Sequence, residues 1–529
     1  MPGIYDFKID KLRNLLENEG LEKTWLRILA THLSSIEQFH YILESEFFSG
    51  IKNFENDLIA NLSIGEIGVL YEYSVSYNNV ESRKSKGQFF TPDDVASFMA
   101  KKSRLFKEGI WMDPCAGIGN LSWHLVAVQD DPEDFLLNRL IVMDIDKLAL
   151  LIARTLLTVS FQEKTNDLFY IIEKNFVVFD FLSVSENGGS DLFNSEKSLS
   201  EIPLHDFVIM NPPYLSTEVD LRFETSQSGD LYSYFLENVI KTSKGFISIT
   251  PQSFTNARKF STLRNLMLSR FRNMTIYAFD NVPANVFKGI KFGSTNSNQV
   301  NSTRASIVVA MEGPGYHKIS PLMRWTSEER IEVFNKIDEF LSEVPLTRDF
   351  FPKVGRSFQD LYMEVSSLQP LGTIISSQPT NYALHIPSAP RYFIPALMRP
   401  VSRASQKVIF FRNARDRKIA YLLINSSFFY WWWRVRDGGM TLSQETISSV
   451  PLLQFEVDDK LISALQRSEK SNRVYKMNAG ASQENVKHPL ALLDRLNRLV
   501  KPTYADLLLT LHQNSELKAL KRFAAEQSK

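Results

Sequence analysis

The chain has 529 residues, too many for one ordinary core, so two or three domains are expected. Its 60 Lys and Arg residues balance 60 Asp and Glu residues, so overall charge gives no support for nucleic-acid binding. Cys115 is the single cysteine, which excludes an internal disulfide and a metal site built from several cysteines; no metal is expected. The sequence has neither an apolar run of about 18 residues nor the apolar core of a signal peptide near its start. It therefore predicts a cytoplasmic protein without a membrane span.

Residues 1–83 form a predicted N-terminal helical segment. Apolar residues between Leu12 and Leu29 recur at the three- and four-residue steps of a helix face, among charged residues. This pattern fits a helical cap, and it also fits a partner surface.

The segment Lys84 to Met99 opens the next predicted domain, residues 84–330. Thr91 is a natural N-cap, with Pro92 at the first helical position. One interpretation is simply a well-capped helix. The other adds Phe89, Phe90 and Thr91 to the wall of a small-molecule pocket at the start of that helix.

Three predicted strands of this domain end in an acidic residue. They are Ile110–Asp113, Leu140–Asp144 and Phe176–Asp180. A turn containing Gly117 and Gly119 follows the first, as in nucleotide-binding βα turns, but it is neither GxGxxG nor a phosphate loop. Asp113 suggests a cationic or hydroxylated ligand, and Asp144, one βα unit later, can hold both ribose hydroxyls. Asp180 also fits a helix N-cap or a loop residue.

The next strand, 207–210, delivers Asn211-Pro212-Pro213-Tyr214. Each proline contributes a carbonyl but no N–H, so this loop offers acceptors and few donors. The Asn211 oxygen and the Pro212 carbonyl can accept both hydrogens of an amino group on a flat ring, and Tyr214 can stack on that ring. The plain structural interpretation is an Asn-Pro turn.

Further strands at 244–251 and 305–310 complete an alternation of strands and helices. The fold class is therefore α/β: a doubly wound, mostly parallel sheet with ligands at the strand carboxyl ends. Residues 254–272 carry five basic residues and no acid, which fits a solvated helix face or a phosphate-contacting face.

Residues 331–529 lose the alternation and form a predicted α+β domain that ends in amphipathic helices. Basic residues there are interleaved with aromatic ones, up to Trp431-Trp432-Trp433-Arg434-Val435-Arg436. Three consecutive tryptophans are not expected to face one core, and Arg434 and Arg436 suit DNA backbone contact. The alternative is an ordinary basic surface over an aromatic core. The polar stretch 466–487 predicts a loop.

Taken together, these stretches resemble the gamma-class N6-adenine DNA methyltransferases of restriction–modification systems, the TaqI-like type II modification methylases. The order matches: Phe-Thr-Pro, then Asp-Pro-x-Ala-Gly-x-Gly, then Asn-Pro-Pro-Tyr, then a C-terminal recognition domain. The likeness covers residues 84–310 well and 380–455 more loosely.

The resemblance implies S-adenosylmethionine as methyl donor. Thr91, Asp113, Ala116, Gly117 and Asp144 would line its pocket, together with Phe90, and Asp180 and Phe181 would flank its adenine. Asn211, Pro212, Pro213 and Tyr214 would hold the target base, and Phe287 would stack on the other face of that base.

The implied activity is methyl transfer to the N6 amino group of an adenine flipped out of double-stranded DNA. The implied enzyme is an adenine-specific, site-specific DNA methyltransferase. It would be a monomer that protects DNA from a separately encoded restriction endonuclease. One alternative is the methylase subunit of a multi-subunit restriction complex. Others are a protein glutamine methyltransferase, which also uses Asn-Pro-Pro-Tyr, and a catalytically dead DNA-binding protein.

Overall fold

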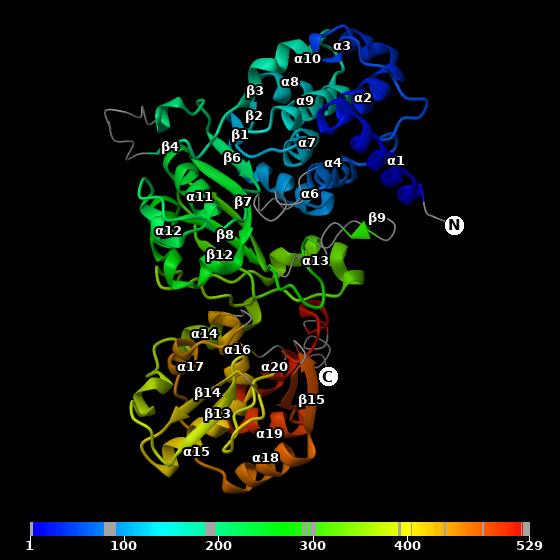
Figure 1. Ribbon diagram of the computed structural model, residues 1–529. Coiled ribbons are helices and arrows are strands. Elements are labelled where there is room, and N and C mark those ends of the chain that lie inside the picture. Colours follow the sequence, from blue (N-terminus) through cyan, green and yellow to red (C-terminus); the bar gives the residue numbers. More distant parts are fainter. Residues whose placement is uncertain are drawn as a thin grey trace. The chain divides into compact units, whose positions relative to one another are not determined.

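The computed structural model describes residues 4–78, 91–185, 197–287, 291–292, 295–296, 303–389, 393–403, 405–437, 441–478, 481–519 and 521. The chain divides into two compact units (Figure 1). The first contains residues 1–276, 285–317 and 347–349. The second contains residues 277–284, 318–346 and 350–529. The described residues of the predicted N-terminal segment, 4–78, belong to the first unit.

A mostly parallel sheet of eight strands lies mainly in the first unit. Its strand order is β12-β8-β11-β7-β6-β1-β2-β3, and β1 pairs in parallel with both β2 and β6. The strands are β1 (Trp111–Asp113), β2 (Leu140–Asp144), β3 (Phe176–Val178), β6 (Phe207–Met210), β7 (Gly245–Pro251), β8 (Asn273–Ala278), β11 (Ala305–Met311) and β12 (His317–Ile319). β11 runs antiparallel to β7. The predicted doubly wound α/β sheet is confirmed.

Every residue of β6 is buried, as expected for a parallel strand covered on both faces. In Figure 1, α11 (Leu231–Thr242) and α12 (Ser261–Arg270) lie on one side of the strands. The other side carries α6 (Asp93–Lys101), α7 (Asn120–Ala127), α8 (Pro132–Asn138) and α9 (Lys147–Phe161).

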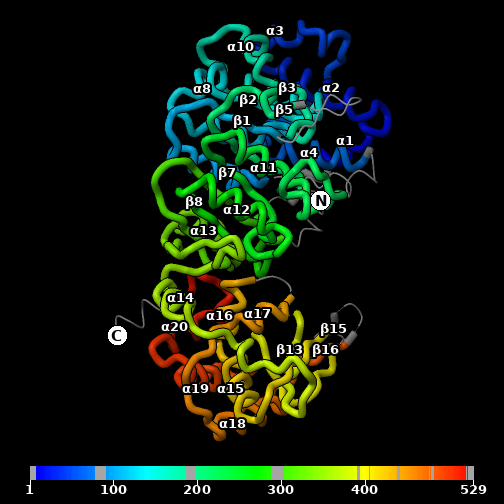
Figure 2. The backbone as a smooth tube through the Cα atoms, turned by 90° about the vertical axis from the view of Figure 1, so that its left-hand side faces the viewer, coloured from blue at the N-terminus to red at the C-terminus, as the bar shows by residue number. Residues whose placement is uncertain are grey.

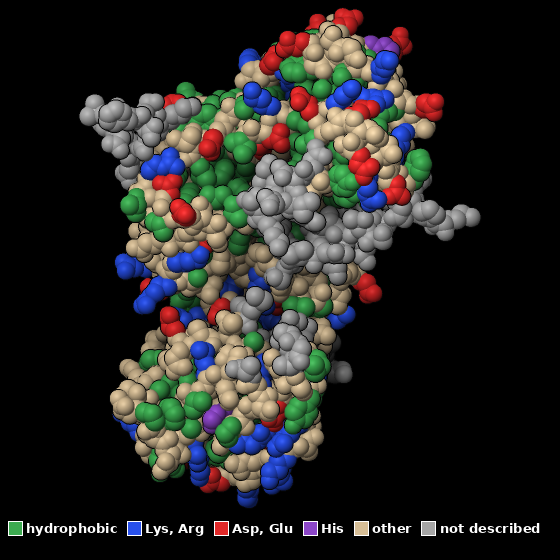
Figure 3. Space-filling model, in the orientation of Figure 1, with side chains coloured by type: hydrophobic (Ala, Val, Ile, Leu, Met, Phe, Trp, Pro, Cys, Tyr) green, Lys and Arg blue, Asp and Glu red, His purple; other side chains and the backbone are tan. Residues whose placement is uncertain are grey.

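The N-terminal helices pack on this second side. They are α1 (Ile4–Glu19), α2 (Leu21–Ser34), α3 (His40–Leu43) and α4 (Ile64–Asn78), and α4 contacts α1 and α7 (Figures 1 and 2). Buried side chains such as Trp25, Leu29 and Leu70 form one apolar cluster with Ile118, in the turn before α7, and Ile152 of α9. Over these helices acidic and basic side chains are interspersed at the surface (Figure 3). The segment is thus a cap on the first unit, one of the two interpretations left open by its sequence.

The remaining short elements of the first unit are α10 (Leu168–Ile171), β4 (Val184–Ser185), β5 (Lys197–Ser198), β9 (Lys291–Phe292) and β10 (Thr295–Asn296).

The basic stretch 254–272 spans α12. Arg264 within it is 1% exposed and donates to the carbonyl oxygens of Phe254, Ala257, Arg348 and Asp349. Burial lowers the pKa of Arg264 to about 10. Arg264 therefore belongs neither to a solvated helix face nor to a phosphate-contacting face, because its guanidinium is hydrogen-bonded to backbone carbonyls inside the unit.

The second unit combines helices with two antiparallel pairs of strands, β13–β14 and β15–β16, as predicted for an α+β domain. Its strands are β13 (Ala383–Pro387), β14 (Gln406–Phe410), β15 (Arg473–Asn478) and β16 (Ala481–Val486). Its helices are α13 (Arg330–Lys336), α14 (Gln359–Val365), α15 (Ala414–Asn425), α16 (Ser427–Arg436), α17 (Gln444–Ser449), α18 (Asp459–Ser471), α19 (Leu490–Val500) and α20 (Ala505–Thr510). The loop predicted at 466–487 is wrong, because this stretch holds the end of α18 and the β15–β16 hairpin.

Helix α16 is the buried centre of the second unit. Trp431, Trp432 and Trp433 are all under 5% exposed, so the prediction that they do not share a core is wrong. α16 contacts α15, α17, α19 and α20, and a helix covered on all sides can bury consecutive residues. Trp431 stacks on Phe358 and Trp432 on Tyr362.

Gly119 allows α7 to begin close to α9. Its φ is +82°, and an added Cβ would lie 3.0 Å from the Cβ of Ala153. We expect Gly119→Ala to lower the free energy of unfolding by about 1–3 kcal/mol, because backbone strain adds to a contact tighter than van der Waals distance. Gly313→Ala is the control, since Gly313 has φ +98° and open space around it. Urea unfolding measures both, and an equal loss would show that the approach to Ala153 is unimportant.

Candidate active site

A cavity of about 380 Å³ opens at the carboxyl ends of β1, β2 and β6. This is where the strand order reverses, because the chain runs outward from β1 to β2 and β3 and then returns to β6 on the other side of β1. Parallel α/β sheets bind ligands at such points. The described lining includes these residues predicted from sequence: Thr91, Asp113, Ala116, Gly117, Asp144, Asp180, Phe181, Asn211 and Pro213. Phe89 and Phe90, also predicted there, lie outside the described residues.

Asp113 ends β1 and is fully buried. Its Oδ2 accepts a hydrogen bond of 2.9 Å from the Ser122 hydroxyl, while its Oδ1 accepts none. Burial raises the pKa of Asp113 to about 7, an effect that the Ser122 hydrogen bond opposes. A cation entering the cavity would favour the ionised form of this carboxyl.

The turn after β1 is fastened to the end of β2. The Ala116 N–H donates to the carbonyl oxygen of Met143 at 3.0 Å, and the Gly117 N–H donates to Asp144 Oδ2 at 2.7 Å. The Asp146 N–H donates to Asp144 Oδ1 at 3.0 Å. Burial raises the pKa of Asp144, and these backbone hydrogen bonds oppose the shift. The strand-end carboxylate is thereby fixed in the cavity wall.

Asp180 and Phe181 follow β3 and form another part of the wall. Phe181 is buried and stacks on Phe235 of α11, with ring centroids 5.4 Å apart. Asp180 is exposed, and its Oδ1 accepts from the N–H of Leu182. An aromatic side chain beside an acceptor can hold a flat heterocycle.

Asn211 is oriented by Thr91. The Asn211 amide nitrogen donates to the Thr91 hydroxyl at 2.9 Å, and Asn120 donates to the Thr91 carbonyl at 2.6 Å. Thr91 is therefore a cross-link between Asn211, after β6, and Asn120, at the start of α7. The predicted N-cap is wrong by one residue, because α6 begins at Asp93 with Pro92 at its cap.

Tyr214 and Phe287 lie together beside this motif. Their rings meet edge to face with centroids 5.9 Å apart, and the Tyr214 hydroxyl donates to the Ile249 carbonyl at 2.9 Å. Phe287 is fully buried, and its N–H donates to the Asn285 side chain at 2.9 Å. The structure thus brings Phe287 to the Asn-Pro-Pro-Tyr loop from 73 residues away in the chain (287 − 214).

Sequence reasoning missed the contribution of α4 to the cavity. Gly68, Tyr71, Glu72 and Val75 line it, and the Tyr71 hydroxyl donates to Asp146 Oδ2 at 2.7 Å. No chemical motif marks these four residues. The sequence places these four residues on one helix face by their spacing. That face mixes polar and apolar side chains, so it does not show the amphipathic pattern by which a helix face is predicted from sequence.

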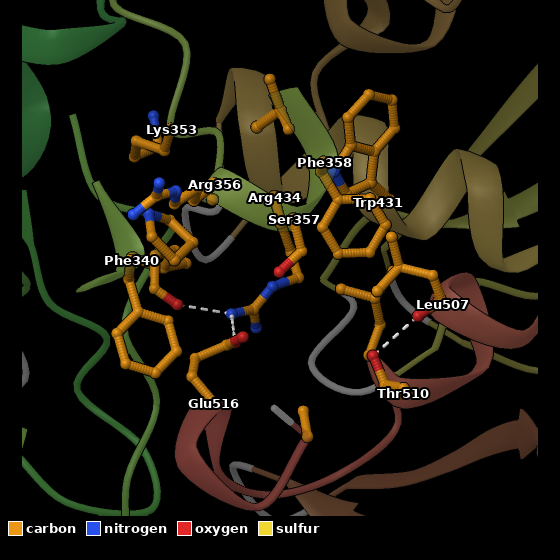
Figure 4. A pocket seen from close by; sticks show the side chains of 16 residues that line it. Phe340, Lys353, Arg356, Ser357, Phe358, Trp431, Arg434, Leu507, Thr510 and Glu516 are labelled. Atoms are coloured by element: carbon orange, nitrogen blue, oxygen red, sulfur yellow. Dashed lines mark hydrogen bonds and ion pairs between the residues drawn. The ribbon is translucent and has the colours of Figure 1, made fainter. Parts of the chain in front are cut away.

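The structure contradicts the predicted DNA contact of Arg434. This residue is 4% exposed, and its guanidinium donates to the Leu322 carbonyl and to Glu516, the latter at 2.8 Å. Figure 4 shows it directed at Glu516 inside a small cavity of the second unit. Asp280 lies 3.8 Å away and also pairs with Arg324 at 3.1 Å. The charge of Arg434 is therefore neutralised within the unit.

Arg436, the second predicted DNA contact, is partly exposed. It pairs with Glu445 at 2.8 Å, and its guanidinium lies over the Phe350 ring, 4.4 Å from the centroid. A contact to phosphate would have to compete with these interactions.

Comparison with known proteins connects this site to restriction–modification methylases. Residues 138–287 match the family model described as the Eco57I restriction-modification methylase. The matched segment runs from the end of α8 to Phe287 and includes Asp144, Asp180 and the Asn-Pro-Pro-Tyr loop. Residues 138–287 are therefore similar to this restriction-modification methylase family.

Three solved structures give the extent of the structural likeness. A DrdV–DNA complex solved by cryo-EM is 13% identical over 73% of this chain and 47% of that chain, with a TM-score of 0.46. A modification subunit of a putative type I restriction enzyme from Vibrio vulnificus YJ016 is 15% identical over 55% and 60%, at 0.35. The type IIG restriction endonuclease BpuSI is 12% identical over 97% and 80%, at 0.41. This chain therefore spans about half of the first of these proteins and three fifths of the second.

Among the described residues, no helix combines the length and the apolar composition that a membrane span requires. Within the same residues, no group of three or more His, Cys, Asp and Glu side chains could hold a metal ion.

The raised pKa of Asp113 predicts a pH-dependent stability. Its pKa is about 7 in the folded chain and near 3.8 in the unfolded chain, so only the unfolded chain ionises between these values. The free energy of unfolding should therefore fall by about 1.4 kcal/mol per pH unit in this window and level off above pH 7. Asp113→Asn removes this titration. The difference between wild type and this variant, from urea unfolding at pH 5 and pH 8, should change with pH; a constant difference would contradict the prediction.

Removing Arg434 should destabilise the second unit. Arg434→Ala leaves Glu516 without its ion-pair partner in the interior, so we expect a loss of about 3–5 kcal/mol in the free energy of unfolding. Arg436→Ala is the matched control, two residues along the same helix. It removes a partly exposed ion pair and should cost at most about 1 kcal/mol. Equal losses in chemical denaturation would argue against the buried network.

Proposed function

We propose that this protein is a site-specific DNA methyltransferase of the gamma, TaqI-like class. It would transfer a methyl group from S-adenosylmethionine to the N6 amino group of an adenine flipped out of double-stranded DNA. The observation that carries the proposal is the position of Asn211. It follows β6, directly beside the cavity lined by Asp113 and Asp144, and its amide is oriented by Thr91.

The cavity fits S-adenosylmethionine. This cofactor carries a sulfonium and an ammonium group, and the buried Asp113 Oδ1 accepts no hydrogen bond from the protein. Asp113 would face the cationic part of the cofactor, Asp144 would accept its ribose hydroxyls, and Asp180 and Phe181 would flank its adenine. When bound, the cofactor supplies an activated methyl group.

The chain itself prepares the target amine. The lone pair of an adenine amino nitrogen is delocalised into the ring, so the amine is a weak nucleophile. The Asn211 oxygen and the Pro212 carbonyl would accept its two hydrogens, which draws the nitrogen toward a tetrahedral shape and frees the lone pair. This is catalysis by positioning and by electrostatic stabilisation.

Tyr214 contributes a flat surface in this proposal. Burial raises the pKa of Tyr214 well above its usual value, and its hydroxyl already donates to Ile249. It therefore stays protonated and is no general base. Its ring, with Phe287 beside it, can accept a base that has left the duplex, since aromatic side chains take up flipped and unpaired bases by stacking.

We further propose that methylation protects DNA from a separately encoded restriction endonuclease and that the protein acts as a monomer in the cytoplasm. The second unit would read the DNA sequence, through side chains other than the buried Arg434.

A second candidate is the methylase subunit of a multi-subunit restriction complex. The burial of Arg434 and of the three tryptophans favours it, because these residues had suggested autonomous DNA recognition. In this case a separate specificity protein would supply the DNA sequence preference.

Asn211→Ala should lower the rate of methyl transfer by on the order of 10²-fold or more, because one of two acceptors for the amine is lost. The measurement is modification-sensitive sequencing of DNA from methylation-deficient cells that express this chain alone. Wild type should give N6-methyladenine at one short motif, and Asn211→Ala should give none. Asn138→Ala, an exposed substitution on α8 remote from the cavity lining, is the control and should match wild type.

Cofactor binding separates the possible failures. Calorimetry should show that Asn211→Ala still binds S-adenosylmethionine, whereas joint loss of binding and activity would mean a structural role for Asn211. If wild type modifies no DNA on its own, the multi-subunit alternative is favoured. Methylation of cytosine would overturn the assignment to adenine.

A further inference from the structure

One face of α4 forms a wall of the cavity. Gly68, Tyr71, Glu72 and Val75 stand at positions i, i+3, i+4 and i+7, the spacing of a single helix face. Tyr73, on another face of the same helix, instead accepts a hydrogen bond from Arg13 at 3.1 Å. The helix thus presents one set of side chains to the cavity and another to α1.

Tyr71 fixes a carboxylate of the opposite wall. Its hydroxyl donates to Asp146 Oδ2 at 2.7 Å, while Asp146 Oδ1 accepts from the N–H groups of Leu148 and Ala149 at 3.0 and 3.2 Å. Both oxygens of Asp146 are therefore held. The hydroxyl remains a donor because burial and the neighbouring carboxylates raise the pKa of Tyr71.

The described lining of the cavity has one sign of charge. It contains the carboxyl groups of Glu72, Asp113, Asp144, Asp146 and Asp180, and no Lys, Arg or His. Asp113 is fully buried with one oxygen that accepts no hydrogen bond. Besides burial, Asp144 raises the pKa of Asp113, and Asp146 raises that of Asp144, because like charges repel one another in a poorly solvated cavity. A bound cation offsets that cost.

We propose that α4 completes the cofactor site: Glu72 lies beside the sulfonium of the bound ligand, and Tyr71 is a positioning residue for Asp146. This inference rests on the proposed function, because it takes S-adenosylmethionine as the ligand. It assigns the N-terminal helical segment a direct role in cofactor selection. The site then prefers the cationic methyl donor over S-adenosylhomocysteine, the neutral thioether that remains after transfer.

The test is isothermal titration calorimetry on the full chain, with S-adenosylmethionine and S-adenosylhomocysteine as separate ligands. Glu72→Gln keeps the size of the side chain and removes its charge. It should weaken binding of S-adenosylmethionine about tenfold and change binding of S-adenosylhomocysteine less than about twofold, because only the former carries a sulfonium charge. If Glu72 had a purely structural role, Glu72→Gln would weaken the binding of both ligands alike.

Tyr71→Phe removes only the hydroxyl that holds Asp146. It should weaken the binding of both ligands about fivefold to tenfold, because the Asp146 carboxylate would contact a part of the molecule that both ligands share. Tyr73→Phe is the matched control on the same helix and should leave both affinities within about twofold of wild type. Thermal unfolding without ligand should give similar midpoints for the two Tyr variants, which separates loss of positioning from loss of folding.

The outcomes distinguish the two proposals. If wild type binds both ligands and Glu72→Gln either has no effect or weakens both equally, the role of Glu72 is wrong while the methyltransferase proposal stands. If Tyr71→Phe behaves like Tyr73→Phe, the positioning role is wrong. If wild type binds neither ligand, the proposed function fails and the role of α4 fails with it.

Discussion

The candidate site depends on the parallel pairing of β1 with two partners. Trp111 is in register with Leu140 of β2 on one side and with Phe207 of β6 on the other. This register places the strand ends Asp113, Asp144 and Met210 at one edge of the sheet. The cavity lies where the chain leaves β1 in one direction and returns on its other side, which separates the loops that follow β1 and β6.

Hydrogen bonds between loops convert this edge into a defined cavity. Gly117 donates to Asp144, Asn211 donates to Thr91, and Tyr71 donates to Asp146. Each bond joins segments that are distant in the chain, and each fixes a side chain that the proposed chemistry uses. Several of the groups so held are carboxyls in a poorly solvated place, which is costly for an empty cavity and suited to a cationic ligand.

The second unit follows a different principle. Its centre is α16, where consecutive tryptophans and Arg434 are buried together, and the charge of Arg434 is compensated by Glu516 and Asp280. Buried ion pairs of this kind contribute little net stability but are costly to break. The aromatic and basic composition of this segment therefore reflects packing, and recognition of DNA would have to use other side chains.

The sequence by itself determined the sheet and most of the cavity wall, because short-range patterns encode them: short apolar strands, an acid at or just after the ends of β1, β2 and β3, and the Asn-Pro-Pro-Tyr loop. β2 and β6 have the predicted bounds. Only the tertiary structure decided that Phe287 meets Tyr214, that α4 lines the cavity and that Arg434 is buried. The reason is that burial and long-range contacts depend on which elements cover a residue, and residue type and spacing do not specify those neighbours.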